Sequence, residues 1–296
     1  MSVAFEFFDC ARAAGTRTIA VVGTAKNVGK TVGVRALCES ARARGIAFAI
    51  TSIGRDGETS DALDALPKPQ LTLPPGTLVA TACELVPRTP ACEILALGER
   101  SALGAIAFVR VRATARFEIG GPPTASGVRR TLAQLALLTD GPIFLDGAID
   151  RIAALAGGED AVIVATGAQS GATIEHVAAV AGDLVRRLSI PRDDGARGDA
   201  IAIDGALGAE RASALIAEFR GARVVVSDPT RITVRGKLFE QLVRAVDLRT
   251  LAPIRVVACT VSSYGREGAL EPRALVAAVA RATGRPTFDL FAGLAA

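Results

Sequence analysis

Short apolar runs alternate with amphipathic stretches along most of the chain. The runs are rich in β-branched residues and end at glycine, proline or polar residues, which is typical of buried strands. They lie at 19–22, 46–53, 76–81, 104–120 (as two joined strands), 142–145, 161–165, 199–203, 223–227 and 254–260. Helical spacing of apolar residues predicts helices after residue 31 and at 91–99, 125–138, 171–187, 209–219, 237–246 and 271–283. Strands alternating with helices predict an α/β fold, with a mainly parallel sheet and helices on both faces.

A glycine-bearing loop follows the first of these strands, in the segment TIAVVGTAKNVGKT at 18–31. A strand, such a loop, Gly-Lys-Thr and then a helix form the phosphate-binding loop (P-loop) of nucleoside triphosphatases. Glycines let backbone N–H groups curl round an anion, and the helix N-terminus adds a favourable dipole. We expect Lys30 to reach the outer phosphates of ATP and the Thr31 hydroxyl to hold Mg²⁺. The residues expected to bind the nucleotide are Gly23, Thr24, Lys26, Asn27, Val28, Gly29, Lys30 and Thr31.

Five residues separate Gly23 from Gly29, one more than in the common P-loop spacing. This longer form, G-T-x-x-x-x-G-K-T, resembles the loop of dethiobiotin synthetase and the cobyrinic acid amide synthetases. The chain has only four lysines, and two of them, Lys26 and Lys30, lie in this loop. Arginine supplies nearly every other basic side chain but cannot replace the compact ammonium that such a loop needs. The lysine usage therefore strengthens the P-loop interpretation.

Carboxylates follow two of the predicted strands. Asp146 comes directly after the strand at 142–145, and Asp56 and Glu58 follow the strand at 46–53. Ligands of open α/β sheets bind at the carboxyl ends of the strands, so we expect Asp146 and Asp56 to serve Mg²⁺ and catalysis together with Lys30. The alternatives are a helix-capping turn at Asp146 and a solvated turn at Asp56. Thr166, which ends the strand at 161–165, is expected near the nucleotide.

Two later loops are candidates for holding the base of the nucleotide. Asp228-Pro229-Thr230 follows the strand at 223–227, and residues 260–265 follow the strand at 254–260. Neither loop carries the Asn-Lys-x-Asp pattern that reads guanine. The sequence therefore favours ATP over GTP.

Composition and charge exclude several other classes of function. The formal net charge is +4, but the arginines are scattered and aromatic residues make up 4% of the chain, so no nucleic acid is expected as a partner. Five cysteines without a C-x-x-C pair and a single histidine do not suggest a metal cluster, and they favour free thiols in a reducing cytosol. We find no signal peptide and no apolar run long enough to cross a bilayer, so we expect a cytoplasmic protein with no membrane partner.

The segment PRDDGARGD at 190–198 is the best candidate for a boundary. It would separate a P-loop nucleotide-binding core at 1–190 from a C-terminal α/β half at 199–296, which we expect to continue the same sheet. The sequence leaves open whether the chain forms a homodimer.

Several segments together resemble one particular family. They are GTAKNVGKTV (23–32), TSIGRDGE (51–58), PPGTLVATA (74–82), GGP (120–122), LDGAIDR (145–151), ATGA (165–168), IDGALG (203–208) and SDPTRI (227–232). The family is the small P-loop subunit described as a reactivase of the coenzyme-B12-dependent lysine 5,6-aminomutase, whose usual companion is a MutS-like ATPase subunit. The resemblance implies an ATP-dependent accessory protein that helps to exchange damaged cobalamin on an aminomutase.

Two other functions compete with this expectation. One is an ATP-dependent ligase that activates a carboxylate, of the dethiobiotin synthetase type, for which Lys26, Arg55 or Arg110 would bind the substrate carboxylate. The other is a GTPase metallochaperone, which the absence of histidine and cysteine clusters disfavours.

Overall fold

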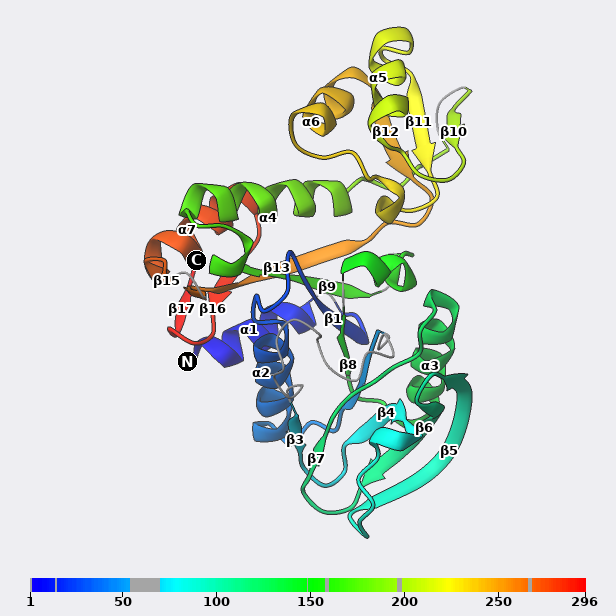
Figure 1. Ribbon diagram of the computed structural model, residues 1–296, viewed down its shortest axis with the longest axis vertical. Helices are drawn as coiled ribbons and strands as arrows, with labels where there is room; N and C mark the ends of the chain where they lie inside the picture. The colour runs from blue at the N-terminus through cyan, green and yellow to red at the C-terminus, as the bar shows by residue number, and fades with distance from the viewer. Residues whose placement is uncertain are drawn as a thin grey trace.

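The computed structural model is an α/β fold built on one large, mostly parallel sheet (Figure 1). It describes residues 2–13, 15–53, 70–147, 149–157, 160–195, 199–265 and 268–296, so Asp56, Glu58 and Arg55 lie outside the described residues. In order across the sheet, its strands are β17 (Leu294–Ala295), β16 (Thr287–Asp289), β13 (Arg255–Ser262), β9 (Ala161–Gly167), β1 (Thr18–Gly23), β8 (Ile143–Asp146), β2 (Ala49–Ser52), β4 (Leu78–Ala82), β6 (Gly104–Val111) and β5 (Cys92–Ser101). Neighbouring strands are parallel from β16 to β4, and β17, β6 and β5 are antiparallel to their neighbours.

Helices cover both faces of this sheet, as the alternating pattern predicts. The first face packs against α1 (Val3–Ala13) and α2 (Lys30–Ala43), and the second against α3 (Ala125–Leu138), α4 (Ile174–Leu188) and α7 (Pro272–Thr283). Within β1, Ile19 and Val21 join the hydrophobic cluster of the first face, and Ala20 and Val22 join that of the second. Side chains of a strand point alternately to its two faces, so β1 is buried on both.

Residues 201–250 form a separate unit, drawn at the top of Figure 1. Its three strands are β10 (Ile201–Ile203), β11 (Arg223–Val226) and β12 (Asp247–Thr250), and its helices are α5 (Ala209–Glu218) and α6 (Gly236–Ala245). A third hydrophobic cluster, with Leu215 of α5 and Phe239 of α6, forms its core. This differs from the expectation that residues 199–296 continue one sheet. The chain leaves the large sheet after α4 and returns to it with β13, β16 and β17.

The helix expected at 91–99 is wrong, because these residues form the edge strand β5. Residues Ser101–Gly104 make a tight turn, in which the Ser101 hydroxyl donates to the Gly104 carbonyl at 2.8 Å, and β5 then pairs antiparallel with β6. This tertiary pairing overrides the local helical preference of the segment. The helix α1 and the strands β12, β16 and β17 were not expected.

The remaining elements are short. A two-stranded ribbon joins β3 (Leu71–Leu73) to β7 (Ala115–Phe117), and a second joins β14 (Tyr264–Gly265) to β15 (Gly268–Ala269). The 3₁₀ helices are η1 (Cys83–Leu85), η2 (Ile149–Leu155), η3 (Ala168–Ser170) and η4 (Pro229–Arg231). None of the helices that the structure describes is both long and apolar enough to span a bilayer.

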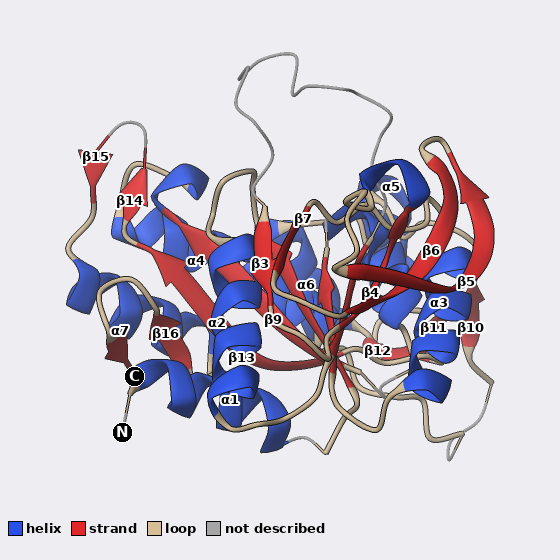
Figure 2. Cartoon of the chain, turned by 90° about the horizontal axis from the view of Figure 1, so that it is seen from below, coloured by secondary structure: helices blue, strands red, loops and turns tan. Residues whose placement is uncertain are grey.

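The position of β1 determines where a ligand can bind. Figure 2 shows the sheet from below, with β5 and β6 at one edge and β16 at the other. The consecutive strands β8 and β9 lie on opposite sides of β1. The order of the strands therefore reverses at β1. The loops that follow these three strands lie together at the carboxyl ends of the strands. Ligands of open α/β sheets bind in the crevice at such a point.

Candidate functional site

The loop at residues 23–31, called here the 23–31 loop, joins the end of β1 to the start of α2. Gly29 adopts a left-handed conformation (φ 89°, ψ 16°) directly before α2, and Asn27 also has a positive φ of 58°. These two residues turn the chain sharply, which glycine and asparagine tolerate better than other residues. The N-cap residue of α2 is Gly29, which has no side chain to cap the helix, whereas Thr124 caps α3 and Thr173 caps α4.

Several backbone N–H groups of this loop have no acceptor in the part of the chain that the structure describes. The first backbone bond of α2 joins the Gly33 N–H to the Gly29 carbonyl at 3.1 Å. Within the described part of the chain, the N–H groups of Val28, Gly29 and Thr31 donate no hydrogen bond. Unsatisfied N–H groups at a helix N-terminus form a site of positive partial charge that suits an anion.

The Lys30 side chain folds back over the same loop. Its Nζ donates to the Ala25 carbonyl at 3.2 Å. A Cβ added at Gly23 would lie 2.9 Å from Lys30 Cδ and 2.8 Å from Val28 Cγ2. Gly23 is therefore required because the lysine stem passes directly over its backbone.

Asp146 ends β8 at the same edge of the sheet, with its backbone paired in register to Val21 of β1. Burial raises the pKa of its carboxyl from 3.8 to about 6, while the Lys30 charge and the Gly147 N–H partly oppose this rise. The structure thus brings Lys30 and Asp146 close enough for their charges to interact. Thr31 begins the first turn of α2 beside Lys30 and is half-buried.

A group of three hydroxyls fixes the start of the loop to the end of β9. The Thr24 N–H donates to the Ala165 carbonyl at 2.9 Å. The Thr24 Oγ1 lies 3.0 Å from Thr166 Oγ1 and 2.6 Å from Ser170 Oγ. Thr166 is fully buried, so its role in this structure is to hold the loop. The sequence reasoning missed Ser170, which lies in η3.

An apolar hollow of about 180 Å³, called here the aromatic hollow, opens beside Gly29. Its walls include Val32 of α2, Tyr264 of the loop after β13 and Phe291 of the turn after β16. The rings of Tyr264 and Phe291 meet edge to face, with centroids 5.2 Å apart, and both remain largely exposed. Thr260 also lines the hollow, and its buried hydroxyl has no hydrogen-bond partner among the described residues.

Asp289 connects the two aromatic walls of this hollow. Its fully buried carboxylate accepts from the Ser263 hydroxyl on one side. On the other side it accepts from the N–H groups of Phe291 at 3.1 Å and Ala292 at 2.9 Å. The sequence reasoning identified the 260–265 loop but missed Asp289 and Phe291. No apolar run precedes Asp289, which follows Arg285-Pro286-Thr287-Phe288, so the signal that marks Asp146 is missing here.

The other expected residues lie in different places. Lys26 is exposed on the 23–31 loop, as is Asn27. Asp228 caps η4 through the Thr230 N–H and does not line the aromatic hollow. Arg110 is far from the loop. It pairs in register with Leu78, the first residue of β4, and so lies towards the amino ends of the parallel strands, whereas the loop lies at their carboxyl ends. Arg110 as a substrate-binding cation at this site is therefore wrong. Among the described residues, no three His, Cys, Asp or Glu side chains form a metal-binding group.

We expect the Asp146→Asn variant to gain stability relative to the wild type as pH rises. Because the pKa of Asp146 is raised in the folded chain, its stabilising contribution is present below pH 3.8 and is lost as pH rises through about 6. The asparagine side chain does not titrate and escapes this loss. Urea unfolding of the metal-free proteins from about pH 4 to about pH 8 measures the difference in free energy. The exposed Asp199→Asn variant is the control, and an equal pH trend in both variants would contradict the burial of Asp146.

A comparison of this chain with protein-family models, with curated proteins and with solved structures finds no match. What the chain does is therefore argued from the geometry of the site.

Proposed function

We propose that the 23–31 loop binds the triphosphate of ATP and that the chain is a P-loop nucleotide-binding protein. The observation that carries this proposal is the set of N–H groups of Val28, Gly29 and Thr31, which have no acceptor among the described residues. They surround a loop over which the Lys30 side chain is already folded. An anion at this position would gain several hydrogen bonds and a full positive charge without a change of the backbone.

The residues around the loop also suit Mg²⁺. Magnesium prefers hard oxygen ligands, and the Thr31 hydroxyl and the Asp146 carboxylate would supply them. The Asp146 side chain is partly buried, and within the protein the rise in its pKa is opposed mainly by the Lys30 charge and the Gly147 N–H. A divalent cation beside it would favour the ionised carboxylate. When bound, the ion would neutralise charge on the phosphates, while Lys30 would bind the outer phosphates as a point charge.

The aromatic hollow is the proposed site of the base. It lies against Gly29, and the aromatic faces of Tyr264 and Phe291 suit a flat, apolar ring. The Thr260 hydroxyl, which has no partner in the described chain, would hydrogen-bond a polar atom of the nucleoside. The sequence lacks the guanine-reading pattern, so we propose ATP as the nucleotide.

We propose further that the protein uses this nucleotide as an accessory factor of a B12-dependent aminomutase, together with a MutS-like ATPase subunit. This part rests on the resemblance of the sequence segments and goes beyond the geometry. The competing ligase function needs a substrate-binding cation beside the loop. Of its three candidates, Arg110 lies towards the amino ends of the parallel strands, away from the loop, and Arg55 lies outside the described residues. Only Lys26 is placed in the loop.

Replacing Lys30 tests the binding of the phosphates. We expect Lys30→Ala to weaken the binding of Mg²⁺–ATP about 10- to 150-fold, because a charge-assisted hydrogen bond contributes about 1.5–3 kcal/mol. Titration calorimetry measures the affinity. The matched control is Lys237→Ala, an exposed lysine in the separate 201–250 unit, which should bind as the wild type does. Unchanged affinity in Lys30→Ala would overturn the proposed function.

The second prediction separates the base from the phosphates. We expect Tyr264→Ala to weaken ATP binding by about 5- to 150-fold, because stacking of a base on an aromatic ring contributes about 1–3 kcal/mol. The same variant should bind tripolyphosphate as tightly as the wild type, and Tyr264→Phe should keep the affinity for ATP. An equal loss for both ligands would show that the aromatic hollow does not hold the base.

Adding the proposed partner proteins tests the role as an accessory factor. We expect ATP hydrolysis by the purified protein to rise when the aminomutase and the MutS-like subunit are added, and to stay low in Lys30→Ala. Phosphate release under saturating Mg²⁺–ATP measures this. ATP hydrolysis that does not change when the aminomutase is added, but rises with a small carboxylate, would instead identify a ligase.

A further inference from the structure

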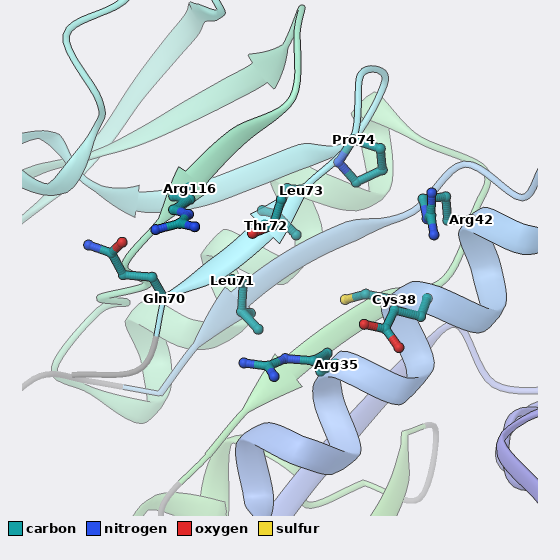
Figure 3. A pocket seen from close by; sticks show the side chains of 10 residues that line it. Arg35, Cys38, Arg42, Gln70, Leu71, Thr72, Leu73, Pro74 and Arg116 are labelled. Atoms are coloured by element: carbon teal, nitrogen blue, oxygen red, sulfur yellow. The ribbon is translucent and has the colours of Figure 1, made fainter. Parts of the chain in front are cut away.

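A second hollow of about 340 Å³ lies between α2 and the β3–β7 ribbon, on the side of α2 that Figure 3 shows. Arg35 and Arg42 of α2 line one wall, and Arg116 of β7 lines the other together with Gln70. No residue of the 23–31 loop lines it, within the part of the chain described. We call it the arginine hollow.

Within the described ranges, the guanidinium groups of Arg35, Arg42 and Arg116 form neither a hydrogen bond nor an ion pair. Some other surface arginines pair with carboxylates, as Arg44 does with Asp9 and Arg130 with Glu99, whereas Arg220 has no such partner among the described residues. What distinguishes the three arginines here is that they line one hollow, whose positive potential favours an anion.

One carboxylate, that of Glu39, also lines the arginine hollow. It lies four residues after Arg35 and three before Arg42 on the same helix, yet it forms no ion pair with either in the described chain. Three guanidiniums and one carboxylate leave a net charge of +2. Glu39 would accept a hydrogen bond from a ligand that also carries a donor.

The rest of the lining indicates binding rather than chemistry. Leu71 and Leu73 of β3 are buried and form an apolar floor, whereas Thr72 and Arg116, which pair in register, are exposed. Cys38 also lines the hollow, but burial raises the pKa of its thiol far above the ordinary value, so it is not a nucleophile. The volume is that of a small-molecule site.

We propose that the arginine hollow binds a small dianionic molecule, either a dicarboxylate or a phosphate monoester. Guanidinium groups recognise both kinds of anion through paired, parallel hydrogen bonds. The net charge of the lining matches two negative charges. The site is separate from the proposed nucleotide site, although α2 contributes to both.

Titration calorimetry with succinate and with glycerol 3-phosphate tests this proposal, with acetate as the singly charged comparison. We expect at least one of the two dianions to bind at one site, and its dissociation constant to rise about tenfold in Arg35→Gln and in Arg116→Gln. Binding of succinate alone identifies a dicarboxylate site, and binding of glycerol 3-phosphate alone identifies a phosphate site.

Two control variants make the result specific. Arg220→Gln removes an exposed arginine from the separate 201–250 unit, and Lys30→Ala removes the lysine of the nucleotide loop. Both should bind the dianion as the wild type does. The proposal is overturned if neither probe binds at millimolar concentration, if acetate binds equally well, or if Arg35→Gln and Arg116→Gln keep the wild-type affinity. If Lys30→Ala loses binding of the dianion while Arg35→Gln and Arg116→Gln keep it, the anion binds in the 23–31 loop and the proposal is overturned.

Discussion

The burial of β1 on both faces and between two parallel neighbours is the constraint on which the site depends. Every residue of this strand is buried, and its backbone pairs with β8 on one side and β9 on the other. The chain can expose polar groups only after Gly23, where the strand ends. Because β8 and β9 end at the same edge, Asp146 and Thr166 are carried to the 23–31 loop by the pairing of the sheet. The geometry of the site is thus a consequence of strand order.

The 23–31 loop combines several features that each reduce the stability of the folded chain. Among the described residues, the N–H groups of Val28, Gly29 and Thr31 have no acceptor, and Asn27 adopts a left-handed conformation. Beside the loop, Asp146 keeps a carboxylate in a partly buried position. Such departures from the usual rules concentrate at functional sites, where a ligand compensates for them. A triphosphate with Mg²⁺ would compensate for the open N–H groups and the buried carboxylate together. The aromatic hollow beside Gly29 would extend the same ligand by a base.

Much of the architecture was predictable from sequence because it depends on local patterns. The run at 19–22 and the Gly-Lys-Thr that follows predict β1, the loop and α2, and the apolar spacing at 171–187 and 271–283 predicts α4 and α7. The edge strand β5 was not predictable, because its pairing with β6 is a tertiary interaction that no periodicity within 91–99 records. The sequence indicated a boundary at 190–198, directly before the 201–250 unit, but not the return of the chain to the large sheet after residue 250. The strands and helices of this unit have ordinary patterns, and only the packing shows that they form a core of their own.

The candidate site divides in the same way. Gly23, Lys30 and Asp146 could be chosen from sequence because each sits at a fixed offset from a strand or helix. Ser170, Asp289 and Phe291 join the site through contacts between segments far apart in the chain, so spacing alone could not assign them. The arginine hollow had no sequence signal at all, because Arg116 and Arg35 line the same hollow only through the packing of the β3–β7 ribbon beside α2.

A crystal structure of the protein with Mg²⁺ and a non-hydrolysable ATP analogue would test the central claim most directly. The account predicts phosphate oxygens within hydrogen-bond distance of the Val28, Gly29 and Thr31 N–H groups and of Lys30 Nζ, with the base between Val32 and the two aromatic rings. A nucleotide bound elsewhere, with the 23–31 loop unchanged and empty, would contradict it.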